Sequence, residues 1–302
     1  MKRREKRKKW TALIGVFMLL LLVSACGNAA KEGSGEAQSE AQSSETPETT
    51  EKGDPVHVKI AITTPDDIIW DAVKKKALED YNIEIETICF SNVNLNQVLA
   101  DKEVDLNAFQ HYAYFEQNIK DLGLDLVSLG DMYIFRLDVY SEKYKSLDEL
   151  PDGAQIAVPN DVVNVGRSLK VFEEAGLITL KKDAGNSPTV EDIESNPKNL
   201  EFVEIEHSQI VRSLSDVDAG IVFVKDAVDA GLDPSADPIY VNEVNLEDQN
   251  LKQYINLIAC RAEDQDNQVY QEVVEAFHSQ EVADAIQEQF QGAAIPAFDV
   301  KK

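Results

Sequence analysis

The sequence predicts an α/β fold with parallel sheets divided between two lobes. From residue 56 onward, apolar runs of strand length alternate with stretches of helical periodicity, an order typical of sheets covered by helices. The part of the 302-residue chain that follows residue 55 is large for one layered domain and natural for two lobes. In folds of this class, ligand sites lie at the carboxyl ends of the strands.

An alternating apolar pattern predicts the first strand over residues 56–62, and a helical pattern follows over residues 67–81. The second strand is expected over residues 83–90. Later apolar runs predict further strands, with helix-like segments between them, at residues 126–129, 132–140, 155–159, 202–205, 219–224 and 254–261. No internal repeat is evident in the sequence.

Residues 1–25 predict a secretory signal peptide. Seven basic residues against one acidic residue precede an apolar run, and the small residues Ser24 and Ala25 lead to Cys26. The run is short for a membrane span, and its flanks are those of a signal peptide. Val23-Ser24-Ala25-Cys26 also resembles a bacterial lipobox, in which the cysteine becomes the lipidated N-terminus. An uncleaved membrane anchor or a chance cysteine is the alternative.

Residues 26–55 are predicted to hold the lipidated cysteine and a disordered tether. The segment is rich in Gly, Ser, Glu, Ala, Gln and Thr, so it cannot bury enough apolar surface to offset the entropy of ordering. A flexible tether of this length has a reach of roughly 30 Å. The formal net charge of −26, which becomes more negative without the basic leader, opposes binding to nucleic acid or anionic lipid. Membrane attachment is therefore expected to come from the lipid.

Two cysteines remain after Cys26, namely Cys89 and Cys260. Each lies in an apolar, strand-like run, so two buried thiols are expected, although export would permit a single bridge between them. The sequence has no paired Cys and His spacing of the kind that a zinc site requires. No metal and no cofactor are expected.

The densest group of candidate binding residues lies between Asp105 and Phe115, where aromatic rings, one imidazole and two side-chain amides occur close together. Aromatic faces bind apolar or sulfur-containing groups, and the amides and imidazole orient a polar group by hydrogen bonds. The alternative is an amphipathic helix whose rings belong to the core.

A second group extends from Val158 to Leu169, directly after a predicted strand and at the start of a helical pattern. Asn160 or Asp161 can cap that helix, and the free N–H groups of a helix start suit a carboxylate. Arg167 can bind the same carboxylate bidentately. The alternative is an ordinary capped helix with a solvated arginine.

Together these two stretches resemble the signatures of the NlpA/MetQ lipoprotein family, the methionine-binding components of ABC importers. Further matching segments follow in order from residue 56 to the C-terminus, including residues 147–153, 175–178, 216–219, 230–232 and 292–296. The resemblance implies a two-lobe, periplasmic-binding-protein-like (type II) fold with a hinge and an interlobe cleft. It implies a monomer at the extracytoplasmic face of the cell membrane, with an ABC permease and its ATPase as partners.

The resemblance also implies the binding residues. Phe109, His111 and Tyr114 would line the side-chain pocket from the first lobe. Asn164 and Arg167 would bind the ligand carboxylate from the second lobe. The resemblance implies further polar or apolar contacts from Asn256, Asn160, Val93 and Phe223.

Several departures from the family pattern fall in the expected pocket. Asn92 and Val93 stand where the family has an Asp-Tyr pair, and Phe223 stands where it has an asparagine. Residues 240–253 form a longer segment than usual. The loss of a buried amide partner costs roughly 1–3 kcal/mol, up to about a hundredfold in affinity. The expected ligand is therefore an amino acid or close analogue, with methionine as the leading candidate and another amino acid as the alternative.

The expected mechanism is hinge closure between two lobes. Residues 56–138 would form the first part of one lobe, residues 139–240 the other lobe, and residues 241–302 would return to the first. The crossovers are expected near residues 137–140 and 238–243, where strand-like runs meet turn residues.

Two other classes of function remain open from the sequence. One is an enzyme on a binding-protein scaffold, although the sequence contains no nucleophile elbow, phosphate loop or dinucleotide fingerprint. The other is a surface lipoprotein that binds a partner through an exposed apolar patch. His57, His207 and His278 are expected to be surface residues, and the acidic groups at residues 66–67 and 204–206 solvated surface.

Overall fold

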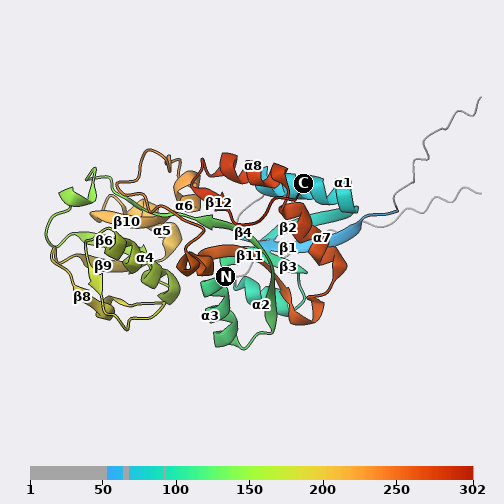
Figure 1. The fold of residues 1–302 in the computed structure, drawn as a ribbon, viewed down its shortest axis with the longest axis horizontal. Coiled ribbons are helices and arrows are strands. Elements are labelled where there is room, and N and C mark those ends of the chain that lie inside the picture. The colour runs from blue at the N-terminus through green and yellow to red at the C-terminus, as the bar shows by residue number, and fades with distance from the viewer. Residues whose placement is uncertain (1–52, 64–67, 92, 302) are drawn as a thin grey trace, which may run out of the picture. The chain divides into compact units, whose positions relative to one another are not determined.

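The structure is a computed structural model that describes residues 53–63, 68–91 and 93–301. Three sheets are present in this part of the chain, with the strand orders β12-β4-β11-β3-β1-β2, β5-β10-β6-β9 and β7-β8. Figure 1 shows the first two as the centres of two lobes. None of the helices in the described ranges is long and apolar enough to cross a membrane. The predicted signal peptide, Cys26, most of the tether and Asn92 lie outside the described residues.

The six-stranded sheet forms the core of the first lobe. Its strands are β1 (Val56–Ile62), β2 (Ile83–Cys89), β3 (Leu106–His111), β4 (Leu126–Phe135), β11 (Ile255–Arg261) and β12 (Ala294–Pro296). Strand β1 runs parallel to β2 and β3, whereas β11 is antiparallel to β3 and β4, and β12 is antiparallel to β4. The predicted parallel pairing is confirmed for β1, β2 and β3, but the sheet is mixed, because β4, β11 and β12 pair in antiparallel fashion. Strand β4 leads the chain out of this lobe and β11 brings it back, so the two run in opposite directions.

Helices cover both faces of this sheet. On one face pack α1 (Ile68–Tyr81), α7 (Gln268–Phe277) and α8 (Gln280–Gln289), and on the other pack α2 (Leu95–Ala100) and α3 (Tyr112–Leu122). Ile69, Val73 and Ala77 of α1 are buried at a helical spacing. Two apolar cores result, one on each side of the strands.

The second lobe is built on the four-stranded sheet. Its strands are β5 (Leu137–Tyr140), β6 (Gln155–Pro159), β9 (Glu201–Ile205) and β10 (Ala219–Phe223). The chain between them forms α4 (Val162–Glu174), β7 (Thr179–Leu180), β8 (Ile193–Ser195) and α5 (His207–Ser213), and α6 (Val224–Asp229) follows β10. Short 3-10 helices are η1 (Leu147–Glu149), η2 (Val190–Asp192), η3 (Gln249–Tyr254) and η4 (Ala262–Asp264). Helix α4 packs on one face of the sheet and α5 on the other.

The predicted strands at residues 56–62 and 155–159 are confirmed to the residue. The expected strand over residues 132–140 is wrong, because β4 continues to Phe135 and β5 begins at Leu137 in the other sheet. The helical alternative for the stretch from Asp105 to Phe115 is wrong for its first half. That half forms strand β3, and helix α3 begins only at Tyr112.

One of the two cysteine predictions is also wrong. Cys260 is buried in the sheet, but Cys89 is exposed at the end of β2, and both are free thiols. Cys89 still pairs with Ile62 of β1, but it is the last residue of the edge strand of the sheet and is open to solvent.

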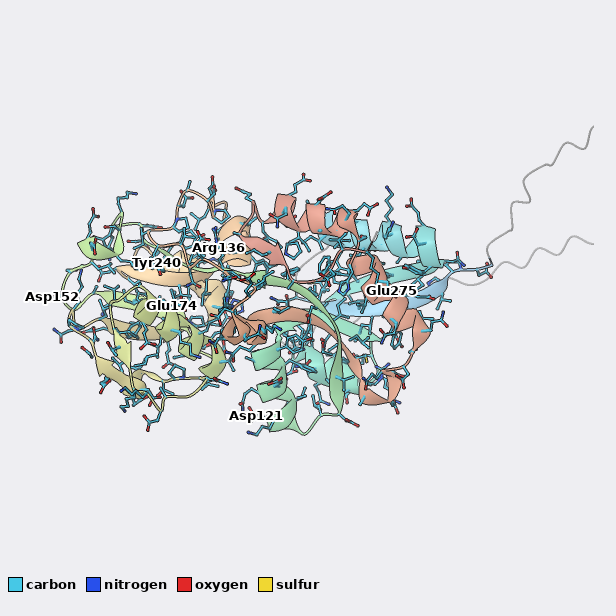
Figure 2. The ribbon with its side chains drawn as sticks, in the orientation of Figure 1. Asp121, Arg136, Asp152, Glu174, Tyr240 and Glu275 are labelled. Atoms are coloured by element: carbon cyan, nitrogen blue, oxygen red, sulfur yellow. The ribbon has the colours of Figure 1, made fainter. Side chains whose placement is uncertain are left out.

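The chain passes between the two sheets at Arg136, which is labelled in Figure 2. It returns near Asn242, and Asp138 joins the two passages. The Arg136 guanidinium donates to Asp138 Oδ2 through Nη2 at 3.0 Å and to the carbonyl of Pro234 at 2.6 Å. The Asn242 N–H donates to Asp138 Oδ1 at 2.9 Å. The Asp138 side chain is fully buried, so this group ties the passages together in a dry environment.

Candidate functional site

A cavity of about 380 Å³ lies between the two lobes. Its volume falls in the lower part of the range of roughly 300–1,000 Å³ that small-molecule sites occupy. Its walls include the carboxyl ends of five strands, β1, β3, β6, β9 and β10. It is lined by Thr63, Phe109, Gln110, His111, Tyr114, Phe135, Asn160, Asp161, Asn164, Arg167, Glu206, His207, Phe223, Lys225, Asp226 and Asn256.

A second hollow, of about 780 Å³, is more open to solvent and lies against the C-terminal segment. It is lined by side chains that include Tyr112, Asp131 and His278. None of the binding residues expected from the sequence lines it, so the interlobe cavity is the candidate site.

The first lobe contributes three aromatic rings to the cavity wall, at the junction between β3 and α3. Phe109 and His111 lie two residues apart on a strand and therefore point to the same face. Nδ1 of His111 caps α3 by accepting from the Tyr114 N–H at 3.2 Å. Tyr114 packs edge-on against both rings, with centroid distances of 6.2 Å to Phe109 and 6.4 Å to His111. The strand-to-helix junction thus holds the three rings as one aromatic wall.

His111 also connects the two lobes. Its Nε2 lies 3.1 Å from Asn164 Oδ1. Because Nδ1 accepts from a backbone N–H, Nε2 carries the proton and donates to the amide oxygen. Burial, and secondarily the charge of Arg167, lower the pKa of His111 to about 4. The imidazole is therefore neutral at neutral pH.

The second lobe contributes the start of helix α4. Asp161 is its N-cap and accepts from the Asn164 N–H at 3.0 Å. The same carboxylate accepts from Asn164 Nδ2 at 3.1 and 2.9 Å. These bonds fix the side-chain amide with its nitrogen toward Asp161 and its oxygen toward His111. A capping interaction therefore also orients a residue of the cavity wall.

Arg167 lies one turn further along α4 and is only 6% exposed. Its Nη2 donates to the carbonyl oxygen of Phe135 at 2.6 Å, and its guanidinium lies over the Tyr254 ring at 4.6 Å from the centroid. Both contacts cross from one lobe to the other. Burial lowers the pKa of Arg167 to about 10, so the side chain keeps its charge at neutral pH.

No carboxylate of the described residues forms an ion pair with Arg167. A buried guanidinium without an anionic partner is costly unless something else supplies the charge. Since Arg167 lines the cavity, its remaining donors are available to an anion there. The geometry suits a carboxylate ligand.

Asn256 reaches the same cavity from β11, whose register places it opposite His111. Its Nδ2 donates to the carbonyl of Tyr133 at 3.3 Å, which leaves the amide oxygen for other contacts. Asn160 and Phe223 also line the cavity. Val93 does not, because it lies on an exposed segment and is itself 50% exposed.

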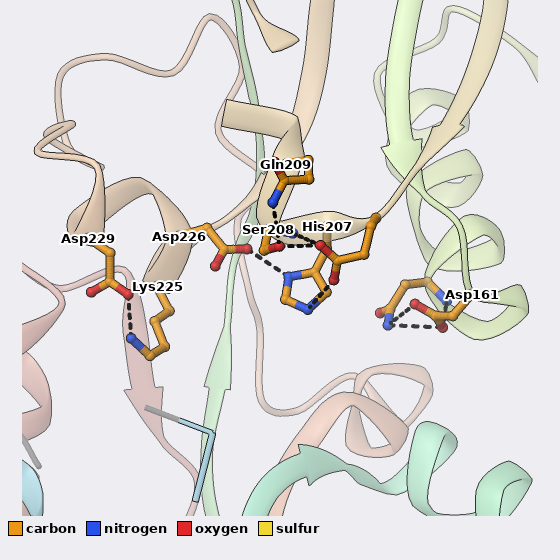
Figure 3. A network of polar contacts seen from close by, with 9 residues as sticks. Asp161, His207, Ser208, Gln209, Lys225, Asp226 and Asp229 are labelled. Atoms are coloured by element: carbon orange, nitrogen blue, oxygen red, sulfur yellow. Dashed lines mark hydrogen bonds and ion pairs between the residues drawn. The ribbon is translucent and has the colours of Figure 1, made fainter. Parts of the chain in front are cut away.

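The sequence prediction missed a polar group on the second-lobe wall. His207 is exposed at the surface, as predicted, but it also lines the cavity, and the sequence analysis did not assign it to the binding site. Its Nδ1 lies 2.9 Å from Asp226 Oδ2 and its Nε2 lies 3.5 Å from Glu206 Oε1 (Figure 3). His207 and Asp226 follow the carboxyl ends of β9 and β10, and that position was the available signal. Lys225 completes this part of the lining.

The other two histidines lie away from the cavity. His57 is exposed beside Glu84, as predicted. His278 is not a surface residue, because it is half-buried, stacks on Phe298 at 4.6 Å and donates from Nε2 to the carbonyl of Asp131 at 2.7 Å. Its role is to fasten the C-terminal segment to β4.

Comparison with known proteins gives matches over most of the chain. The family model described as NlpA lipoprotein matches residues 58–298. A D-methionine-binding lipoprotein MetQ of Yersinia pestis is 40% identical over 253 residues, which cover 82% of this chain and 91% of that protein.

Solved structures match equally well. A nutrient binding protein from Burkholderia cenocepacia bound to methionine is 38% identical with a TM-score of 0.74, covering 80% of this chain and 100% of that one. An ABC transporter periplasmic substrate-binding protein from Coxiella burnetii is 36% identical, also with a TM-score of 0.74, covering 80% and 100%. These matches confirm the predicted two-lobe α/β fold of the periplasmic-binding-protein class.

Proposed function

Because the chain belongs to the NlpA lipoprotein family, we propose that it is the extracytoplasmic substrate-binding lipoprotein of an ABC importer. It captures an amino acid, with methionine as the first candidate, and delivers it to a membrane permease. The observation that carries the proposal is Arg167, a buried cation without a protein carboxylate among the described residues, on the wall of an interlobe cavity. The names of the relatives support methionine.

The ligand carboxylate binds Arg167, whose planar donors match its two oxygens. Asn164 lines the cavity from the second lobe and Asn256 lines it from the first. Both side-chain amides supply contacts to the polar end of the ligand. A charge-assisted contact of this kind contributes roughly 1.5–3 kcal/mol. It is stronger in the low dielectric of a buried site than at an exposed one, and Arg167 is buried.

The side chain of the ligand lies against Phe109, His111 and Tyr114. A thioether makes favourable contacts with aromatic ring edges at about 5 Å, each worth roughly 0.3–1.5 kcal/mol. The low pKa of His111 matters for this contact, because a neutral imidazole can pack against an apolar group without the cost of burying a charge.

Calorimetric titration of methionine tests the proposal. The Arg167→Ala protein is expected to lose at least about a hundredfold in affinity, and Arg167→Lys is expected to be intermediate because an ammonium cannot pair bidentately. Arg212→Ala, which removes an exposed arginine from α5 of the same lobe, serves as the matched control. Unchanged methionine affinity in Arg167→Ala would refute the carboxylate assignment.

A second ligand within the same family is favoured by one observation. Phe223 lies on the cavity wall where the family pattern has an asparagine, so the polar contacts of this wall differ from those of the pattern. If calorimetry recorded heat from another amino acid and none from methionine, the assigned ligand would change and the proposed transport function would remain. No comparable observation favours an enzyme or a surface interaction protein.

The lobes of this proposal are residues 56–136 with 241–302, and residues 137–240, because β5 begins at Leu137 in the second sheet rather than at the expected residue 139. The bonds from His111 to Asn164 and from Arg167 to Phe135 support closure, since each joins the two lobes across the cavity. A ligand that contacts both lobes shifts the population toward the closed form by its differential affinity.

We further propose that Cys26 carries the lipid that anchors the mature, monomeric protein to the cell membrane. The lipobox-like sequence before it and the lipoprotein names of the relatives support this anchor. Metabolic labelling with palmitate is expected to mark the wild-type protein and not Cys26→Ala. Equal labelling of both proteins would place the lipid elsewhere.

A further inference from the structure

A cluster of charged side chains lies on the second-lobe wall of the cavity, apart from the residues assigned to the ligand carboxylate. We call it the acidic wall and define it as Glu206, His207 and Asp226. All three line the cavity. The imidazole of His207 lies 2.9 Å from Asp226 Oδ2, a contact that Figure 3 shows, and 3.5 Å from Glu206 Oε1.

The acidic wall is held by regular structure. Glu206 is the N-cap of α5 and accepts from the Ser208 N–H at 3.1 Å and from the Ser208 hydroxyl. Asp226 lies in the first turn of α6. The ring of Phe223 packs edge-on against His207, with a centroid distance of 5.2 Å. The three polar groups therefore have fixed positions, as a recognition site requires.

The charges of the acidic wall have the sign that attracts a cation. Glu206 and Asp226 bring two carboxylates to the cavity, and Asp161 of the α4 N-cap adds a third nearby. Lys225 also lines the cavity, but its ammonium pairs with Asp229 at 2.6 Å outside the cavity lining. With His207 neutral, this wall has an excess of negative charge.

Arg167 and the acidic wall have different charged neighbours. Besides burial, the groups that influence the pKa of Arg167 are Tyr254, Asp138 and Glu174. Those that influence His207 are Asp226, Glu206 and Asp161. Arg167 thus brings a positive charge to the cavity wall, and Glu206 and Asp226 bring negative charges, which is the complement of a ligand that carries both charges.

We propose, on the basis of the function proposed above, that the acidic wall is a specificity subsite for a protonated amine of the ligand. Glu206 and Asp226 accept hydrogen bonds from the ammonium group, and His207 positions Asp226. The amine is the α-amino group of an amino acid such as methionine or the terminal amine of a basic side chain. Either group presents the same N–H donors and the same charge.

The subsite makes binding depend on the protonation of His207. Partial burial lowers the pKa of His207, but the hydrogen bond to Asp226 and the charges of Asp226, Glu206 and Asp161 outweigh it, so the pKa is raised above its ordinary value. An imidazolium competes with the ligand ammonium for the same carboxylates. Amine binding therefore releases a proton, and affinity rises as the pH rises through the pKa of His207.

Calorimetry with three probes tests the subsite: L-methionine, its des-amino analogue 4-(methylthio)butanoate, and L-lysine. If the subsite binds the α-amine, methionine binds the wild type roughly ten- to hundredfold more tightly than the analogue. If the subsite binds a side-chain amine, lysine binds more tightly than methionine. In both cases Asp226→Asn and Glu206→Gln are expected to remove most of the preference, while Glu204→Gln, an exposed site on β9 away from the cavity, keeps it.

The outcomes separate this proposal from the function on which it rests. Absence of binding of all three probes to the wild type would refute both. Binding with preferences that Asp226→Asn and Glu206→Gln leave unchanged would refute the subsite alone, and Arg167→Ala would still report on the carboxylate site. The amine affinity of His207→Gln is expected to be nearly independent of pH between about 5.5 and about 8, where the wild type gains affinity. Equal pH profiles would remove His207 from the subsite.

Discussion

The imidazole of His111 is kept neutral by contacts that leave no room for a second proton. Nδ1 accepts from the Tyr114 N–H, and Nε2 donates to Asn164 Oδ1. Protonation of Nδ1 would break the helix cap and place a cation near Arg167 in a buried site. The pKa of about 4 follows from burial and from that neighbouring charge.

This low pKa predicts a loss of stability on acidification. The unfolded chain takes up the proton near the ordinary pKa of about 6.5, whereas the folded protein takes it up only near 4. The free energy of unfolding is therefore unaffected by His111 protonation above about pH 6.5. It falls by roughly 3 kcal/mol as the pH drops toward 4. Urea unfolding at pH 7 and pH 4.5 measures it. His111→Gln is expected to show a smaller drop, whereas the exposed-site control His57→Gln keeps the wild-type drop. A full drop in His111→Gln would contradict the assignment.

Some residues of the cavity wall were predictable from the sequence and others were not. Phe109, His111 and Arg167 stand in dense groups of chemically distinctive residues, so the pattern itself was informative. His207 and Asp226 are single polar residues after two different strands, and single residues of that kind are common on any surface. Only the folding of β9 and β10 side by side with β6 brings them to the cavity with Asp161.

The crossover between the two sheets shows that hydrophobic periodicity alone does not always locate the boundary between two strands. Residues on both sides of Arg136 are apolar and strand-like, so periodicity alone does not mark the point where β4 ends and β5 begins. The break becomes intelligible from its contacts, since Arg136 turns away to bind Asp138 and the Pro234 carbonyl. Strand β6, in contrast, is flanked by turn residues, and its bounds were predicted correctly.

Removal of the Arg136 side chain is expected to destabilise the crossover strongly. Arg136→Ala leaves the fully buried Asp138 carboxylate without its cation, a loss of roughly 3–5 kcal/mol in the free energy of unfolding. Asp138→Asn is expected to cost less, because the charge it leaves unpaired is that of Arg136, which is partly exposed and still donates to the Pro234 carbonyl. Urea unfolding of both proteins, with the exposed-site variant Arg212→Ala as control, compares them.

The pH dependence of Arg136→Ala provides a second measurement. Burial raises the pKa of Asp138 above its ordinary value in the folded protein, and the loss of Arg136 raises it further. The folded variant therefore binds a proton at a pH where the unfolded chain does not, so its stability relative to wild type recovers as the pH falls from 7 toward 5. An equal deficit at both pH values would show that Asp138 does not carry the penalty.

Across the described chain, the two lobes meet at the cavity through a small number of direct polar contacts. The Asn164 amide reaches His111, and Arg167 reaches the Phe135 carbonyl and the Tyr254 ring. Such contacts are modest in net free energy, because each replaces contacts with water. A ligand that fills the cavity and touches both walls is therefore the main source of free energy for closure.

Closure by the ligand is measurable as compaction. Shifting a two-state equilibrium from mostly open to mostly closed requires roughly 5 kcal/mol of differential binding, which a carboxylate on Arg167 and a side chain on the aromatic wall can jointly supply. Saturating methionine is expected to reduce the radius of gyration in small-angle scattering of the wild type. At about a hundred times its Kd, it is also expected to raise the free energy of unfolding by about 2.7 kcal/mol. The Arg167→Ala protein, folded but without the carboxylate contact, is expected to show neither effect at the same concentration. If calorimetry recorded binding to the wild type while scattering remained unchanged, the lobes would have to be closed before the ligand enters, and the ligand would act by filling a cavity already formed.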